Sequence, residues 1–242
     1  IAESLVSQGL ADASSVATPF ASPRRLAVYV TGVAERAADR QSKQKLMPVA
    51  VALDAAGNPT PALLKKLAAL GADISIVPRL RRESDGKAEV LFMDSVVKGM
   101  TLVLGLAKAL WESLDKLPIP KVMAYQLADG WSTVNFVRPV HGLVALHGAE
   151  VVDVQMFGLK AGRETQGHRF EAKSPIVSIR DADSYAQQME SEGAVIAGFE
   201  SRRAEIEKQL KAAAAKEGLK PIEDEALLDE VTALVERPNV LT

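Results

Sequence analysis

Cysteine is absent from the 242 residues of this sequence. Disulfide bonds, thiolate nucleophiles and cysteine-ligated zinc or iron–sulfur sites are therefore excluded. The absence also suits a reducing compartment, and we expect a cytoplasmic protein. No uninterrupted run of about 18 apolar residues occurs, so the sequence predicts no membrane-spanning helix. The formal net charge is only −2, so any attraction to nucleic acid must come from a local basic patch.

What is present is ordinary for a globular protein, with 48% hydrophobic and 25% charged residues. The length allows one large domain or two modest ones. Ile1 leads straight into the back half of an amphipathic pattern, and the chain stops in the middle of another element. We therefore expect a piece of a longer polypeptide.

Hydrophobic periodicity and turn residues predict both helices and strands. One strand is expected over 26–33, extended chain over 41–53, and two extended pieces over 74–96 around a Ser84–Gly86 turn. Residues 132–180 are rich in turns and β-branched residues and should be mostly strands. Helices are expected over residues 1–9, 60–70, 97–115, 182–192, 198–217 and 224–237. In the third helix an apolar stripe is formed by Leu104, Ala107, Leu110, Trp111 and Leu114.

Together these elements predict an α+β fold, with mixed or antiparallel sheets flanked by helices. The proline-bearing segment KLPIPKV, residues 116–122, predicts a subdomain boundary. We expect an N-terminal α+β subdomain over 1–116, a strand-rich subdomain over 117–180 and a helical segment over 181–242.

Motifs for catalysis and ligand binding are missing. The glycines fit neither G-x-x-x-x-G-K-[ST] nor G-x-G-x-x-G, and no serine lies in G-x-S-x-G. His141, His147 and His168 form no metal-ligand pair, so a hydrogen-bonded structural role is expected for each. Carboxylates on the late helices alternate with lysines and arginines, as on a solvated face. The sequence therefore predicts no catalytic residue and no metal site.

Basic residues concentrate in turns bounded by glycine and proline. Arginine's planar fork suits a phosphate and an internal carboxylate alike, so both partners stay open for each of these residues. Arg138, Arg163 and Arg169 neighbour prolines, glycines and apolar residues. We expect these three to be half-buried with definite partners.

Five stretches give the sequence a family resemblance. Each is weak alone, but their order and spacing resemble the β subunit of the bacterial two-subunit glycine–tRNA ligase (glycyl-tRNA synthetase) over nearly the whole chain. That subunit is much longer, and the match corresponds to its N-terminal third. The stretches are SPRRLAVYV (22–30), LPIPKVM (117–123), NFVRPVHGLVALHG (135–148), AGRETQGHRF (161–170) and ALLDEVTALVERPNVL (226–241).

The resemblance implies that the chemistry occurs in another polypeptide. In this family a catalytic α subunit joins glycine to ATP and then to tRNA, using ATP and Mg²⁺, while the β subunit supplies tRNA binding and assembly. The implied partners are that α subunit and the tRNA for glycine. The resemblance also implies a cytoplasmic heterotetramer that does not bind a membrane. No cofactor is expected in this fragment.

Three motif positions depart from the family pattern. Gly142 and Arg237 stand where tryptophan is usual, and Ala124-Tyr125 stands where Arg-Trp is usual. At Gly142 and Arg237 the change removes an aromatic ring that base stacking would use, whereas Tyr125 keeps one. The arginines that can contact phosphate are retained.

Two functions follow for this part of the protein. In one, it docks the α subunit through exposed apolar helix faces, and its arginines hold the fold through internal carboxylates. In the other, it is an accessory module that binds the tRNA backbone. Buried Arg–Glu or Arg–Asp pairs would favour the first, and a contiguous positive groove the second. The candidate tRNA-binding residues are Arg24, Arg25, Lys121, Arg138, Arg163, His168 and Arg169.

Overall fold

The computed structural model describes residues 1–54, 56–84, 86 and 88–241. It contains helices and several small antiparallel sheets, so the predicted α+β class is confirmed. The chain divides into two compact units, Ile1–Ala37 with Met100–Thr242 and Ala38–Gly99. The boundaries expected near residues 116 and 180 both fall inside the first unit, and a subdivision there stays a prediction.

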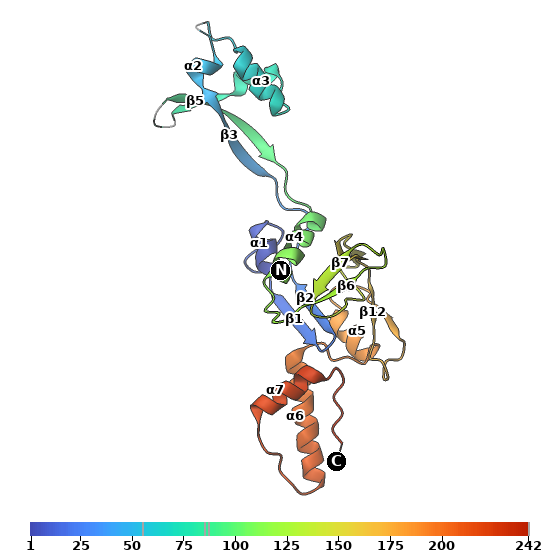
Figure 1. Ribbon diagram of the computed structural model, residues 1–242. Helices are drawn as coiled ribbons and strands as arrows, with labels where there is room; N and C mark the ends of the chain where they lie inside the picture. Colours follow the sequence, from blue (N-terminus) through green and yellow to red (C-terminus); the bar gives the residue numbers. More distant parts are fainter. Residues whose placement is uncertain (55, 85, 87, 242) are drawn as a thin grey trace. The chain divides into compact units, whose positions relative to one another are not determined.

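The Ala38–Gly99 unit is a three-stranded antiparallel sheet with helices at one end (Figure 1). β3 (Arg40–Pro48) and β4 (Arg81–Ser84) flank the central β5 (Glu89–Val97). Between β3 and β4 the chain forms α2 (Val49–Ala52), α3 (Pro61–Ala69) and the 3₁₀ helix η1 (Ile74–Arg79). These elements enclose a small core of Ala52, Leu63, Leu67, Leu91 and Met93.

The expected hairpin is confirmed by β4 and β5, although Asp85 of its turn lies outside the described residues. Two expectations of extended chain were wrong in part. Residues 49–52 form α2, and Ile74–Arg79 is helical instead of extended. The side chain of Asp73 accepts a hydrogen bond from the Ser75 backbone N–H at 2.7 Å, which caps that turn.

The start of α3 follows the predicted capping pattern. Thr60 is the N-cap, its Oγ1 accepts from the Leu63 N–H at 3.4 Å and donates to the Val51 carbonyl at 2.8 Å, and Pro61 follows. Gly71, just beyond the helix, has a φ of 72°, a conformation that glycine adopts at little cost.

Thr60→Ala should therefore lower the free energy of unfolding by about 1 kcal/mol, because it removes this cap. Urea unfolding followed by circular dichroism measures the change. Thr60→Ser retains the hydroxyl and should stay close to the wild-type protein. A serine variant as unstable as the alanine variant would contradict the capping explanation.

The first unit begins with a helix and a hairpin. α1 (Ala2–Ser7) packs on α4 (Leu102–Asp115), and β1 (Ala17–Ser22) pairs antiparallel with β2 (Arg25–Val30). A Cβ at Gly105 of α4 would lie 2.1 Å from Leu10 Cδ1. The missing side chain thus lets the buried Leu10 pack directly against the helix backbone.

The stripe predicted for α4 is buried only in part, with Ala107 and Leu110 packed against the core. Leu104 is 64% exposed and Trp111 is 53% exposed, whereas Leu102, Gly105 and Ala109 are buried. The helix also begins at Leu102, because β5 continues to Val97. Close packing favours the side of α4 with small residues, and the bulkier side stays open.

Short antiparallel strand pairs occur in the middle of the chain, but most of residues 132–180 lies in the turns and loops between them, so the expectation of mostly strands was wrong in extent. Met156 and the core residues Ala145, Val152, Val154 and Ala161 are buried there. A parallel bridge between Val144 and Gly162 joins two of the family-like stretches. The antiparallel pairs are β6 (Met123–Gln126) with β7 (Thr133–Phe136), β8 (Leu146–His147) with β9 (Glu150–Val151), β10 (Gln155–Met156) with β11 (Leu159–Lys160), and β12 (Glu164–Gln166) with β13 (Ile176–Ser178).

The last elements are α5 (Tyr185–Ser191), α6 (Phe199–Lys216) and α7 (Glu225–Leu234), close to the predicted bounds. α6 and α7 lie side by side (Figure 1). The apolar positions of α7 are largely exposed, including Leu227, Val231 and Leu234, whereas Thr232 is fully buried. Among the helices of the described residues, none combines the length and hydropathy needed to cross a bilayer.

Candidate nucleic-acid interface

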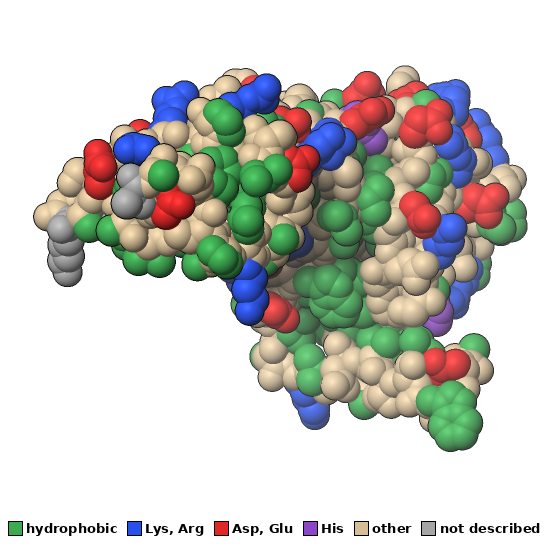
Figure 2. Space-filling model, turned by 90° about the horizontal axis from the view of Figure 1, so that it is seen from above, with side chains coloured by type: hydrophobic (Ala, Val, Ile, Leu, Met, Phe, Trp, Pro, Cys, Tyr) green, Lys and Arg blue, Asp and Glu red, His purple; other side chains and the backbone are tan. Residues whose placement is uncertain are grey.

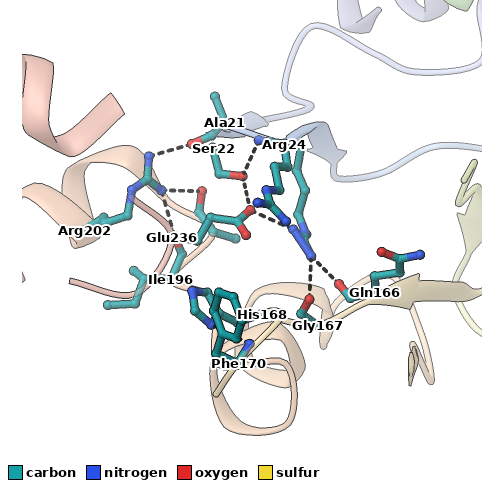
Figure 3. Close-up of polar contacts among 12 residues, drawn as sticks. Ala21, Ser22, Arg24, Gln166, Gly167, His168, Phe170, Ile196, Arg202 and Glu236 are labelled. Carbon is teal, nitrogen blue, oxygen red and sulfur yellow. Dashed lines mark hydrogen bonds and ion pairs between the residues drawn. The ribbon is translucent and has the colours of Figure 1, made fainter. Parts of the chain in front are cut away.

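One of the predicted basic residues, Arg25, lies where segments distant in sequence converge (Figure 3). We call this cluster the arginine junction, defined by Ser22, Arg25, Arg202 and Glu236. It joins the β1–β2 turn, the loop after β12, residues 196–198 and the chain just after α7. Tyr185 lies nearby, and the pKa of its phenol is raised, mainly by burial. The charge of Glu236 also raises this pKa, and the charge of Arg25 opposes the shift.

Arg25 forms a buried ion pair at the junction. Its Nη1 lies 2.7 Å from Glu236 Oε1, and the two side chains are only 14% and 7% exposed. Ser22 Oγ donates to the same carboxylate oxygen at 2.6 Å. Arg25 Nη2 donates to the backbone carbonyls of Gln166 and Gly167. The side chain therefore ties the β1–β2 turn to two other segments, which is an internal role.

Arg202, in the first turn of α6, is completely buried and binds backbone carbonyls. Nε donates to Thr232 O at 3.0 Å, Nη1 to Ile196 O at 2.7 Å and Nη2 to Ala21 O at 2.8 Å. Burial lowers the pKa of the guanidinium, and the charge of Glu236 raises it. An arginine so placed remains protonated, and it satisfies carbonyls from three separate segments.

Arg163 is half-buried with definite partners, as predicted, but the partners are carbonyls and not a carboxylate. Nη2 donates to Ala149 O at 2.7 Å, and Nη1 donates to Arg180 O at 3.1 Å and to Ile179 O at 3.3 Å. These bonds hold the start of β12 to the chain beyond β13.

His168 shapes the turn that follows β12. Its Nδ1 accepts from the backbone N–H groups of Phe170 at 3.4 Å and Glu171 at 3.3 Å, so the ring proton lies on Nε2. Its own N–H donates to Gly193 O at 2.6 Å. A Cβ at Gly167 would lie 3.1 Å from that same oxygen, so the turn packs tightly on the chain at residue 193.

Arg24, Lys121, Arg138 and Arg169 are exposed, and no side-chain partner occurs for them among the residues that the structure describes. For Arg138 and Arg169 the expectation of half-burial was wrong, because both lie in surface bends or turns. Lys121 and Arg138 each lie two residues beyond the last pair of the β6–β7 hairpin, Met123 with Phe136. Arg24 and Arg169 instead neighbour residues of the arginine junction and of the His168 turn.

The other histidines differ from each other. His147 Nε2 lies 2.7 Å from the Val33 carbonyl, which confirms a structural hydrogen bond. His141 is exposed and lines a shallow depression of about 450 Å³ with Lys160, Arg163 and Glu164. Within the described part of the chain, no group of His, Asp and Glu is arranged to hold a metal ion.

Charge is mixed on the face drawn in Figure 2, where basic and acidic side chains are interspersed. Many of the helical carboxylates have lysine partners, such as Glu207 with Lys211 and Glu205 with Lys208. On α6 the carboxylates thus pair with lysines at the surface, as their spacing along the helix predicted. Because the formal net charge of the chain is only −2, any contact with RNA must depend on a few placed cations.

Comparison with known proteins identifies the chain. The model of the family "Glycyl-tRNA synthetase beta subunit" matches residues 1–242. The chain belongs to this family. It is 73% identical over 241 residues to the glycine–tRNA ligase beta subunits of Thiobacillus denitrificans and of Leptothrix cholodnii, with 100% of the chain and 34% of each relative covered. The relative from Methylobacillus flagellatus is 64% identical over 250 residues, with 35% of it covered.

The chain thus spans about a third of the length of these beta subunits. The resemblance deduced from five stretches is confirmed. Sequence reasoning did not find Arg202 or the role of Glu236, although Glu236 lies within the stretch that ends the family-like pattern. It also passed over Phe170, the last residue of the AGRETQGHRF stretch.

Proposed function

We propose that this chain is a non-catalytic part of a cytoplasmic, ATP-dependent glycine–tRNA ligase and binds the backbone of the tRNA for glycine. In this proposal the α subunit provides the catalytic site with its ATP and Mg²⁺, and the chain contributes to assembly of the α/β heterotetramer. The observation that supports tRNA binding is the placement of Arg24 and Arg169. Both are exposed cations on turns that the arginine junction and His168 hold in place.

Exposed arginines on fixed turns suit phosphate contacts. The backbone that carries each arginine is already fixed, so binding has to order only the side chain, and the guanidinium fork matches a phosphate. A-form RNA presents phosphates and 2′-hydroxyls, so backbone contacts of this kind bind RNA without reading sequence. Lys121 and Arg138, at the open end of the β6–β7 hairpin, are a second pair suited to the same task.

The alternative function is a structural domain that docks the α subunit without touching tRNA. Two observations favour it. Arg25 pairs with Glu236 and Arg163 binds backbone carbonyls, so both arginines have a structural role inside the protein. The exposed stripe of Leu227, Val231 and Leu234 on α7 also offers an apolar face to a protein partner.

The Arg24→Ala/Arg169→Ala double variant of the complete α/β ligase separates the two functions. We expect weaker tRNA binding and a plot of log affinity against log salt that is shallower by about 1.5, since each lost phosphate contact removes about 0.7–0.9. ATP–pyrophosphate exchange with glycine should be unchanged, because it does not involve tRNA. The matched control is Lys65→Ala/Lys66→Ala, which removes two exposed charges from α3.

An unchanged salt dependence in the arginine double variant would count against tRNA binding by these turns. If Leu227→Ser/Val231→Ser on α7 then weakened α-subunit association alone, the docking function would be preferred.

A further inference from the structure

Phe170 is 85% exposed in a chain in which aromatic residues make up only 5%. Single exposed apolar residues are common on protein surfaces, so exposure alone carries no argument. The surroundings of Phe170 distinguish it. Its ring belongs to a turn whose backbone is fixed by several hydrogen bonds, and its neighbours are charged.

The turn that carries Phe170 is anchored on both sides by backbone hydrogen bonds. The Phe170 N–H donates to His168 Nδ1, and the Ala172 N–H donates to the His168 carbonyl at 3.2 Å. Lys173 N–H donates to Glu192 O at 3.3 Å, which ties the end of the turn to the chain after α5. The rings of His168 and Phe170 lie edge to face, with centroids 6.2 Å apart. Phe170 is thus held on an ordered backbone, and binding to its ring costs little ordering.

Cations surround this turn. Arg169 precedes Phe170 and is exposed. Arg237 Nε lies 3.8 Å from Glu171 Oε2, which places its side chain against the same turn. Arg24 is next to Arg25, whose Nη2 binds the carbonyls just before His168. Glu171 pairs with Arg237, and Glu205 also feels the charge of Arg237. The cations near this turn that have no side-chain partner among the described residues are therefore Arg169 and Arg24.

An aromatic ring among arginines fits a nucleobase better than an apolar protein face. Every base has a π-face that stacks on an aromatic side chain, and the phosphates on either side of that base pair with arginine. A protein contact centred on Phe170 would need an apolar surround, but the adjacent Arg169 and Glu171 are exposed and charged.

We propose that Phe170 is a stacking platform for an unpaired nucleobase of the tRNA, with Arg169 and Arg24 binding the flanking phosphates. This inference rests on the proposed function, because it assumes that tRNA reaches the His168 turn. It adds a base contact, insensitive to salt, to the backbone contacts of the arginines.

The test compares Phe170→Ala, Phe170→Leu and Phe170→Trp in the complete α/β ligase, with the tRNA for glycine as the ligand. Phe170→Ala should weaken binding by about 5- to 150-fold, the range for loss of one base–aromatic stack. The slope of log affinity against log salt should stay at the wild-type value, because no charge is removed. Phe170→Leu should not restore binding. Phe170→Trp should restore it, and tRNA should quench the fluorescence of the introduced tryptophan.

The matched control is Trp131→Ala, which removes a ring that is 89% exposed on the turn between β6 and β7. It should leave tRNA affinity unchanged. Wild-type affinity in Phe170→Ala, or full recovery with leucine, would overturn the stacking role. So would a loss of α-subunit association in Phe170→Ala without loss of tRNA binding.

The two proposals fail differently. If Arg24→Ala/Arg169→Ala reduces the salt slope and Phe170→Ala has no effect, stacking is overturned and tRNA binding stands. If neither variant changes tRNA affinity, the proposed function fails, and the inference fails with it.

Discussion

Arg202→Ala is expected to lower the free energy of unfolding by about 3–5 kcal/mol, because it removes the buried donor of several backbone carbonyls. The guanidinium is fully buried, and alanine would leave the carbonyls of Ala21, Ile196 and Thr232 without their donor. Each buried acceptor left unsatisfied costs about 1–3 kcal/mol, so three of them account for a loss of this size. Urea unfolding of the variant measures it.

Two further variants sharpen the test of Arg202. Arg202→Lys should rescue little, because a single ammonium cannot reach carbonyls that lie along the separate directions of a guanidinium fork. Arg203→Ala is the matched control, since its neighbouring guanidinium pairs with Glu225 and Asp229 at the surface. We expect only a small change there. Equal losses at positions 202 and 203 would contradict the role given to the buried carbonyl contacts.

Glu236→Ala should also destabilise the protein by about 3–5 kcal/mol, because it leaves the buried guanidinium of Arg25 without its carboxylate. Ser22 loses its acceptor as well. Thermal unfolding in low salt and in high salt measures the effect. The loss should persist in high salt, since screening acts weakly on a buried pair.

A double-mutant cycle with Arg25→Met separates the ion pair from its surroundings. The double variant should be more stable than the sum of the single losses predicts, because neither charge is then left buried alone. Strict additivity would mean that the pair contributes nothing. A fall in tRNA affinity for Arg25→Met at unchanged stability would instead return Arg25 to the phosphate-binding residues.

Local signals predicted the elements of the fold well. Thr60 followed by proline, with Gly71 beyond, marked α3, and the apolar spacing of Leu227, Leu228 and Val231 marked α7. Such signals act within a few residues, so they are legible without the tertiary structure. The division of the chain was harder to see, since the strands of the Ala38–Gly99 unit interrupt what the sequence presents as one N-terminal region.

Tertiary partners were not predictable from the sequence. Arg202 and Arg203 are adjacent in a charged helix, yet the first is buried and the second binds surface carboxylates. Successive helix positions point about 100° apart, and only packing decides which one faces inward. The same limit applies to Leu104 and Trp111, which are exposed because α1 packs on the side of Gly105, whereas Ala107 and Leu110 of the same stripe pack against the core.

The two segments of the first unit that flank Ala38–Gly99 are hydrogen-bonded to each other. Ala37 N–H donates to Met100 O at 2.9 Å, and Leu102 N–H donates to Glu35 O at 2.8 Å. The chain thus leaves the first unit at Ala37 and re-enters it at Met100, and these two residues are hydrogen-bonded to each other. Changes in the length or sequence of the Ala38–Gly99 unit therefore need not move the core residues of the first unit. The two units are therefore free to diverge at separate rates, each constrained by its own packing.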